Sequence, residues 1–258
     1  MTFLRRLGVI LAHELRLARR DPLPVMVLIA FPVITMAFLK PAFQPALVQH
    51  GYPHANGSEQ VVPGQATMSA FFIVSLMTFS FFFEFGWATW DRLRASQASS
   101  LEIIVGKSIP RVAMAIGQFV VILAAGVLLF GLDVRGPAYA LVPLVLAFAL
   151  CLVVLGVAVT AVCRTAQQAQ AFAIVGMVLF GAIGGALVPF DVLPEWARAV
   201  APATPTYWAM RGFESVILDG DGLDGVAAPV GALLAMMLVF AVIALRRLRF
   251  DEAKVGWA

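Results

Sequence analysis

Long hydrophobic runs, separated by shorter polar stretches, dominate the pattern along this chain. A helix needs about 20 residues, at 1.5 Å each, to cross a bilayer. Runs that can do so are bounded at residues 23–39, 66–88, 112–132, 138–162, 169–189 and 227–245. The first is the shortest and contains prolines, which membrane helices tolerate when neighbouring helices satisfy the freed carbonyls. The pattern predicts an all-α integral membrane protein with six transmembrane helices in one domain, residues 1–258.

Composition and charge agree with this prediction. Hydrophobic residues make up 61% of the 258 and charged residues 13%, whereas soluble domains are closer to half apolar and a quarter charged. Fourteen of the 18 Lys and Arg residues lie in the N-terminal segment, 89–111, 163–168 and the C-terminal tail. The positive-inside rule places these segments, and with them both termini, in the cytoplasm. No basic patch is interleaved with stacking aromatics, so we predict no nucleic-acid partner.

The N-terminal segment, residues 1–22, has the pattern of an amphipathic helix. Its leucines fall on one side, and most of its arginines, including Arg16 and Arg20, fall on the other. We expect this helix to lie flat on the inner leaflet. Glu14 falls within the apolar face, where an unpaired carboxylate is costly. It either pairs with a nearby arginine or docks to a cytoplasmic partner or a neighbouring helix end.

A stretch rich in proline and tryptophan follows the fifth hydrophobic run. Prolines divide it into pieces too short to cross the membrane, yet the pieces are amphipathic and carry interface-seeking aromatics. We expect a re-entrant or interfacial helical hairpin with its loop over residues 190–226, rather than a solvated loop, on the outer side. The residues that mark it are Pro189, Pro194, Trp196, Pro202, Pro205 and Trp208. Just before it, Gly181 and Gly185 have GxxxG spacing, a weak signal for close helix approach. We expect the two glycines to be candidates for a gating or translocation path.

The mostly polar segment 89–111 contrasts with its hydrophobic neighbours. Leu93, Gln97, Leu101 and Ile104 recur at helical spacing, which predicts a short amphipathic helix. The fragment Gly106-Lys107-Ser108 is close to a phosphate-binding loop, but the motif needs glycine where Leu101 stands, and no strand precedes it. We therefore predict that this chain binds no ATP, and the sequence indicates no metal site or other cofactor.

The second hydrophobic run carries an aromatic stripe and one acidic residue. Phe72, Phe79 and Phe83 share one helical face, which either contacts lipid and other helices or lines a substrate path. Glu84 lies among phenylalanines within the run, where a charge is costly. It either reaches water or a neighbouring helix end, or acts in gating or substrate entry.

These features together resemble the membrane subunit of ABC exporters of the ABC-2 type. The resemblance rests on the basic N-terminal helix, "RRDP", "WDR", "LEIIVGK" and "GGALVPFDVLPEWARAVAPATPTYWAMRGF", in this order along the chain. It implies that residues 3–20 form a connecting helix, 91–107 a cytoplasmic coupling element and 190–213 the outer hairpins. Asp91-Arg92-Leu93 and Ser99-Ser100 depart from the family's usual coupling sequence.

In that element, the residues expected to contact an ATPase combine apolar anchors with charges. They are Asp91, Arg92, Leu93, Leu101, Glu102, Ile104 and Lys107. A passive connector could be far shorter than this segment, which favours the coupling role over a plain loop.

The function implied by the resemblance is ATP-driven export. We expect a permease that pairs with a second copy or a paralogue in the bilayer of a bacterial plasma membrane. Separate ABC ATPase subunits would bind ATP and Mg²⁺ and power export of a hydrophobic or amphiphilic compound such as a drug, lipid or lipid-linked glycan. An ion-coupled secondary transporter and a membrane-embedded lipid-modifying enzyme remain alternatives. The first usually needs charged groups near mid-membrane, and the second needs a catalytic constellation that the sequence does not offer.

Overall fold

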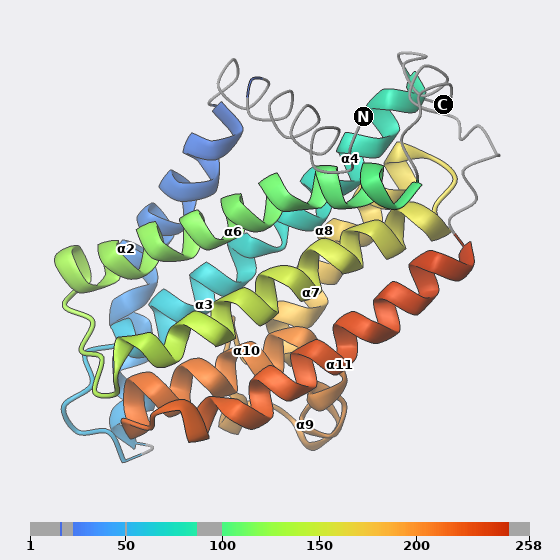
Figure 1. Ribbon diagram of the computed structural model, residues 1–258. Helices are drawn as coiled ribbons and strands as arrows, with labels where there is room; N and C mark the ends of the chain where they lie inside the picture. The colour runs from blue at the N-terminus through green and yellow to red at the C-terminus, as the bar shows by residue number, and fades with distance from the viewer. Residues whose placement is uncertain (1–15, 17–22, 50, 87–99, 248–258) are drawn as a thin grey trace.

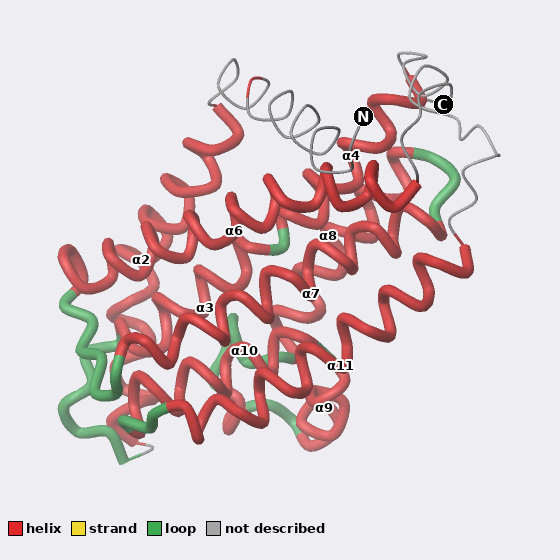
Figure 2. The backbone as a smooth tube through the Cα atoms, in the orientation of Figure 1, coloured by secondary structure: helices red, strands yellow, loops and turns green. Residues whose placement is uncertain are grey.

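The computed structural model describes residues 16, 23–49, 51–86 and 100–247, which form helices joined by loops, with no strand (Figures 1 and 2). Six helical segments of this described part are long and apolar enough to cross a membrane. The predicted all-α architecture with six spans is confirmed. Within the N-terminal segment, only Arg16 is described, and it is helical and exposed. Glu14 and Arg20 lie outside the described residues, so the amphipathic helix stays a prediction.

The first two spans are longer than the hydrophobic runs that predicted them. Helix α2 (Leu23–Gln49) continues well past the predicted end at 39, with Pro32, Pro41 and Pro45 inside it. The second span consists of α3 (Ser58–Ala70) and α4 (Phe72–Gly86), separated only at Phe71. It begins before the predicted start at 66 because its first turns are polar, and a hydropathy window counts polar residues as loop.

The start of α3 is fixed by a reciprocal cap. The Asn56 side-chain oxygen accepts a hydrogen bond from the Ser58 N–H at 2.9 Å. The Glu59 carboxylate accepts from the N–H groups of Asn56 and Gly57, both at 3.1 Å. These contacts satisfy backbone donors that a helix start leaves unpaired. The Gly57 backbone has φ +94° and lies against Lys40, so this turn requires glycine.

The remaining spans follow the predicted order with shifted ends. They are α6 (Ser100–Phe130), α7 (Leu141–Val162) after the short 3₁₀ helix η1 (Ala138–Ala140), α8 (Ala166–Ile183) and α11 (Leu223–Arg247). Helix α6 has 31 residues, which makes it roughly 46 Å long against a hydrocarbon core of about 30 Å. Residues 100–111 are therefore the first turns of this long helix and not a separate short helix.

The spans alternate in direction, so the bundle has two distinct ends (Figure 1). At one end, called here the junction end, α4 finishes, α6 begins, residues 163–165 join α7 to α8, and α11 finishes. The other, called here the loop end, carries residues 51–57, 131–140 and 184–222. The four basic residues not counted on the cytoplasmic side lie in the loop-end half of the bundle. They are Lys40, Arg135, Arg198 and Arg211.

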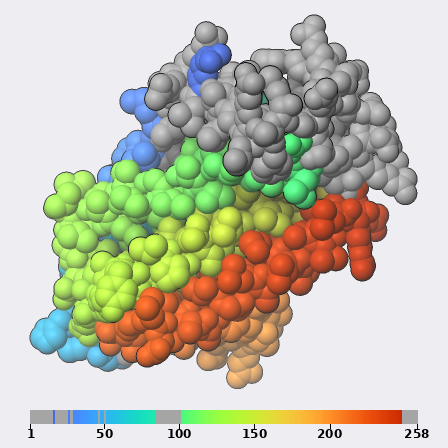
Figure 3. Space-filling view, in the orientation of Figure 1, coloured from blue at the N-terminus to red at the C-terminus, as the bar shows by residue number. Residues whose placement is uncertain are grey.

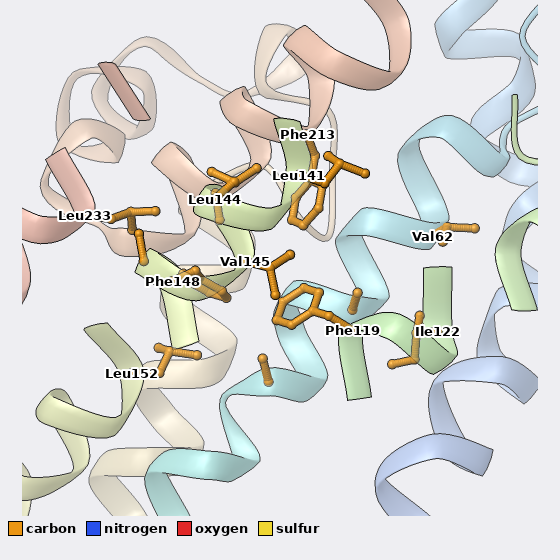
Figure 4. Packing of buried hydrophobic residues seen from close by; sticks show 14 of the residues in the cluster. Val62, Phe119, Ile122, Leu141, Leu144, Val145, Phe148, Leu152, Phe213 and Leu233 are labelled. Atoms are coloured by element: carbon orange, nitrogen blue, oxygen red, sulfur yellow. The ribbon is translucent and has the colours of Figure 1, made fainter. Parts of the chain in front are cut away.

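The core centres on α7, which packs against α11, α4, α6, α8 and the short helix α10 (Pro205–Glu214). Four fully buried rings link these elements. Phe119 stacks on Phe213 with ring centroids 5.8 Å apart and meets Phe148 edge-on at 6.0 Å. Figure 4 shows these three residues within the core. Phe71, at the α3–α4 break, meets Phe148 edge-on at 6.3 Å. The aromatic cluster thus connects the second, third and fourth spans with the segment that follows α8.

That segment contains a chain of short helices. They are η2 (Phe190–Val192), α9 (Glu195–Val200), η3 (Ala201–Ala203), α10 and the π-helical turn η4 (Ser215–Asp219). One face of α10 is buried in the bundle, where Gly212 lies against Leu144. The expected short helices are present, but their position relative to a membrane is untested, and the re-entrant hairpin stays a prediction.

Candidate functional site

The junction of α4 and α6 holds four of the residues predicted to contact an ATPase. Leu101 is 58% exposed, and Ile104 is half-buried against the core. Glu102 and Lys107 are buried. This division follows from the helical geometry of α6, whose one side packs on α4 while the other side is exposed. Asp91, Arg92 and Leu93 lie outside the described residues.

Lys107 forms a direct connection between these two spans. Its ammonium group donates a hydrogen bond to the Ser80 carbonyl oxygen at 3.0 Å and lies 5.7 Å from the centre of the Phe81 ring. The sequence predicted Lys107 as a charge that sets the register of a docked ATPase. Its location in the protein interior instead suits a role in fixing α6 to α4. Burial against Phe81 could not be read from the local sequence, because the two residues are distant along the chain.

The predicted aromatic stripe occupies the least buried face of α4. Phe72 and Phe83 are exposed, and Phe79 is half-buried. The rings of Phe79 and Phe83 are stacked with centroids 5.7 Å apart. On the opposite side, Ile73 and Met77 are fully buried. Helix α4 therefore has one exposed aromatic edge, while the rest of its described surface is packed against the bundle. Glu84 belongs to α4, but its side chain lies outside the described residues.

A chain of polar side chains beside this helix was not predicted. Thr35 of α2 donates to the Gln65 side-chain oxygen of α3 at 3.0 Å. One turn later, the Gln118 amide of α6 donates to the Ser69 hydroxyl at 2.6 Å. Ser69 in turn donates to the Gln65 backbone carbonyl at 2.6 Å. The signal was the polar start of α3, which the hydropathy pattern had assigned to a loop. These contacts join α2, α3 and α6.

The turn after α8 packs directly on α3. Gly185 has φ +85°, and its carbonyl oxygen accepts a hydrogen bond from the Gln60 amide at 2.7 Å. A Cβ at Gly64 would lie 2.5 Å from the Ala186 carbonyl oxygen, so α3 must have glycine at this contact. Gly181 packs against the Met68 side chain. Because α8 ends at Ile183, Gly181 and Gly185 do not share one helical face.

The predicted hairpin residues begin or brace the short helices. Pro194 immediately precedes α9, and Pro205 is the first residue of α10, where a missing N–H costs nothing. Trp208 donates from its indole nitrogen to the Pro202 carbonyl oxygen at 2.8 Å. Trp196 is 66% exposed. Pro189 precedes η2 in the same segment.

Polar groups line a small cleft between α10 and the turn after α8. The Tyr52 hydroxyl donates to the Asp219 carboxylate at 2.9 Å. Burial raises the pKa of Tyr52 to about 12, and the bond to Asp219 adds to this effect. Burial also raises the pKa of the Glu214 carboxyl, although Arg211, at 3.2 Å, opposes the shift. The phenol therefore stays protonated and keeps η4 attached to the loop after α2.

We expect Tyr52→Phe to destabilise the loop end modestly. Loss of one hydrogen bond costs about 0.5–1.5 kcal/mol, and 1 kcal/mol corresponds to about 2–4 °C in a chain of this size. The melting temperature of the purified protein should fall by about that amount. Tyr139→Phe is the matched control, because Tyr139 is 63% exposed. Equal melting temperatures for Tyr52→Phe and the unmodified chain would show that this bond contributes nothing.

Comparison with known proteins identifies the family. The ABC-2 type transporter model matches residues 5–218, which is most of the chain. The chain belongs to the ABC-2 type transporter family. It is also similar to the linearmycin resistance permease protein LnrN of Bacillus subtilis (strain 168), with 29% identity over 160 residues. The matched region covers 62% of this chain and 41% of LnrN, so the chain spans less than half the length of that relative.

Membership of this family confirms that the chain is a multi-pass permease of the ABC-2 type. As a membrane transport subunit, it is not itself the ATPase. The family also implies an ATP-binding partner subunit in general. The roles of the individual junction, stripe and hairpin residues are not tested by these comparisons and stay predictions.

Proposed function

We propose that this chain is the permease subunit of an ATP-driven exporter, and that it works as a pair of permease chains with two ABC ATPase subunits. The family match carries this proposal, and the exposed edge of α4 supports the pairing. Helix α3 packs against α2, and α4 packs against α8. Both flanking helices expose large apolar side chains, among them Phe38 of α2 and Phe172 of α8.

The cargo we propose is a hydrophobic or amphiphilic compound that is toxic to the cell. A second permease facing the α2–α4–α8 side would place the aromatic stripe of each copy beside a shared path. Such a path suits apolar groups, while the stripe itself brings no charge. The name of LnrN records resistance to linearmycin, which supports a compound of the antibiotic class over a nutrient.

Co-expression of the chain with a candidate ATPase tests this proposal. Cells that carry both should survive higher concentrations of at least one compound in a panel of amphiphilic antibiotics. Cells with the permease alone, or with an ATPase unable to hydrolyse ATP, should not. The purified chain alone should neither bind nor hydrolyse ATP. Nucleotide binding by the isolated chain, or export driven by an ion gradient without any ATPase, would contradict the proposal.

Within this function, we expect Glu84→Gln to impair export while the protein still folds. Glu84 lies two residues before the end of α4, and an amide costs less than a carboxylate in apolar surroundings, so the replacement should not reduce insertion. If the Glu84 carboxylate acts in gating or cargo entry, its loss should lower export by about threefold, which corresponds to roughly 0.65 kcal/mol of free energy. Glu195→Gln, at an exposed position of α9, is the control. Normal protection by Glu84→Gln at equal expression would assign Glu84 a structural role.

A further inference from the structure

Helices α6 and α7 diverge near the loop end and leave a groove with a volume of about 400 Å³. Every side chain that lines it is apolar. Phe119 and Leu132 form buried parts of its wall, whereas Val120 and Val142 are more than 60% exposed beside it. Figure 3 shows α6, α7 and α11 side by side across one face of the molecule, and Figure 4 shows Val145 next to Phe119. The groove is therefore open to the side, where a bilayer surrounds the helices.

The contacts of the α6–α7 connection and of α6 keep the groove between the two helices open. The Arg135 and Gly136 N–H groups donate to carbonyl oxygens of η4 at 3.3 and 2.9 Å, and the Arg135 guanidinium donates to the Leu218 carbonyl oxygen at 3.0 Å. These bonds hold the α6–α7 connection against η4. On its other side, α6 approaches α3, since a Cβ at Gly126 would lie 2.6 Å from Val62. Helix α6 is thus drawn toward α3, while the start of α7 is held by η4.

The dimensions of the groove indicate what occupies it. Along α6 it extends from Ile116 to Val127, a rise of about 16 Å. Half of the hydrocarbon core is about 15 Å thick. The groove runs along the helix axis and ends near the loop end, so its length matches the depth of one leaflet. Because it has no polar lining, its chemistry suits a single extended hydrocarbon chain.

The geometry points to a site for one acyl chain of a bilayer phospholipid, taken from the leaflet at the loop end. The glycerol end of the acyl chain would lie near Leu132 and Val134, and its methyl end would reach Ile116 and Phe119. At Phe119 it would touch the aromatic cluster, because this ring stacks on Phe213 of α10. The site is separate from the exposed edge of α4 and does not depend on the proposed cargo.

Photolabelling of the full chain in vesicles tests this assignment. The vesicles contain phosphatidylethanolamine and phosphatidylglycerol, with a trace of lipid that carries a diazirine near the acyl-chain methyl end. After irradiation, labelled residues are mapped by mass spectrometry. We expect Ile116, Phe119 and Leu123 to carry at least fivefold more label than Val121, which is 42% exposed on α6 outside the groove. A diazirine near the glycerol should move the label toward Leu132 and Val134.

Two further outcomes decide against the site. Label spread evenly over groove residues and Val121 would show only the ordinary lipid layer around the protein. Disulfide bonds that form on oxidation between two copies carrying Val142→Cys would show that a second permease covers the groove. Ala124→Trp, which adds a large side chain to the groove lining, should abolish the excess label, and Val121→Trp should not. If Ala124→Trp does not fold, the depth-dependent map of the unmodified chain still decides.

Discussion

Leu101→Asp should leave a six-span protein in the membrane that no longer retains its ATPase. Leu101 is 58% exposed in the first turn of α6, so a carboxylate at this position leaves the core unchanged. As an apolar anchor in an ATPase cleft, it would contribute about 2 kcal/mol or more, which is roughly a thirtyfold change in affinity. Both ATPase retention in a pull-down and protection of cells should be lost.

Two variants of the same helix separate docking from folding. Ser108→Asp introduces the same charge at a half-buried position outside the predicted contact and should retain the ATPase. Ile103→Asp places the charge at a buried position and should lower the amount of folded protein. If Leu101→Asp is folded, binds the ATPase normally and protects cells, residues 91–107 are only a connector. Coupling would then have to be sought in residues 3–20 or beside Arg164.

Sequence was sufficient to predict the six spans because the relevant property, an apolar stretch of bilayer length, is local. The order of the elements and the short helices after α8 follow equally from local signals, such as Pro194 and Pro205 at helix starts. The polar start of α3 could not be recognised as part of a span. Gln60, Gln65 and Ser69 become acceptable inside the bundle only because α2, α6 and the turn after α8 supply their hydrogen-bond partners.

The junction shows the same limit for charged residues. Spacing correctly places Leu101 and Ile104 in a helix, since that prediction needs only the helical period, and their contact with an ATPase stays a prediction. The position of Lys107 could not be predicted without knowledge of α4, because the Ser80 carbonyl and the Phe81 ring contact its ammonium group. Contacts of this kind join residues that are distant along the chain, and no local pattern reports them. The contact of Lys107 with α4 therefore suits an internal connection, while its docking role stays a prediction.

That connection leads to a prediction distinct from docking. If an ATPase moves the segment between α4 and α6, the two helices must move together for the second span to follow. The Lys107 ammonium joins them through a charged hydrogen bond at 3.0 Å, and such bonds contribute about 1.5–3 kcal/mol. Lys107→Met keeps an apolar stem beside Phe81 and removes the ammonium group, and with it this bond and the contact of the charge with the Phe81 ring.

We therefore expect Lys107→Met to hold its ATPase and hydrolyse ATP while export falls by about tenfold or more, because 1.4 kcal/mol corresponds to a factor of ten. The measurement is ATP consumed per molecule exported, in vesicles, with the compound against which the intact system protects cells. Lys107→Arg retains a donor of the same charge and should restore much of the export. A uniform fall in ATPase retention, hydrolysis and export would indicate that Lys107 only stabilises the fold, and unchanged export by Lys107→Met would contradict the connection altogether.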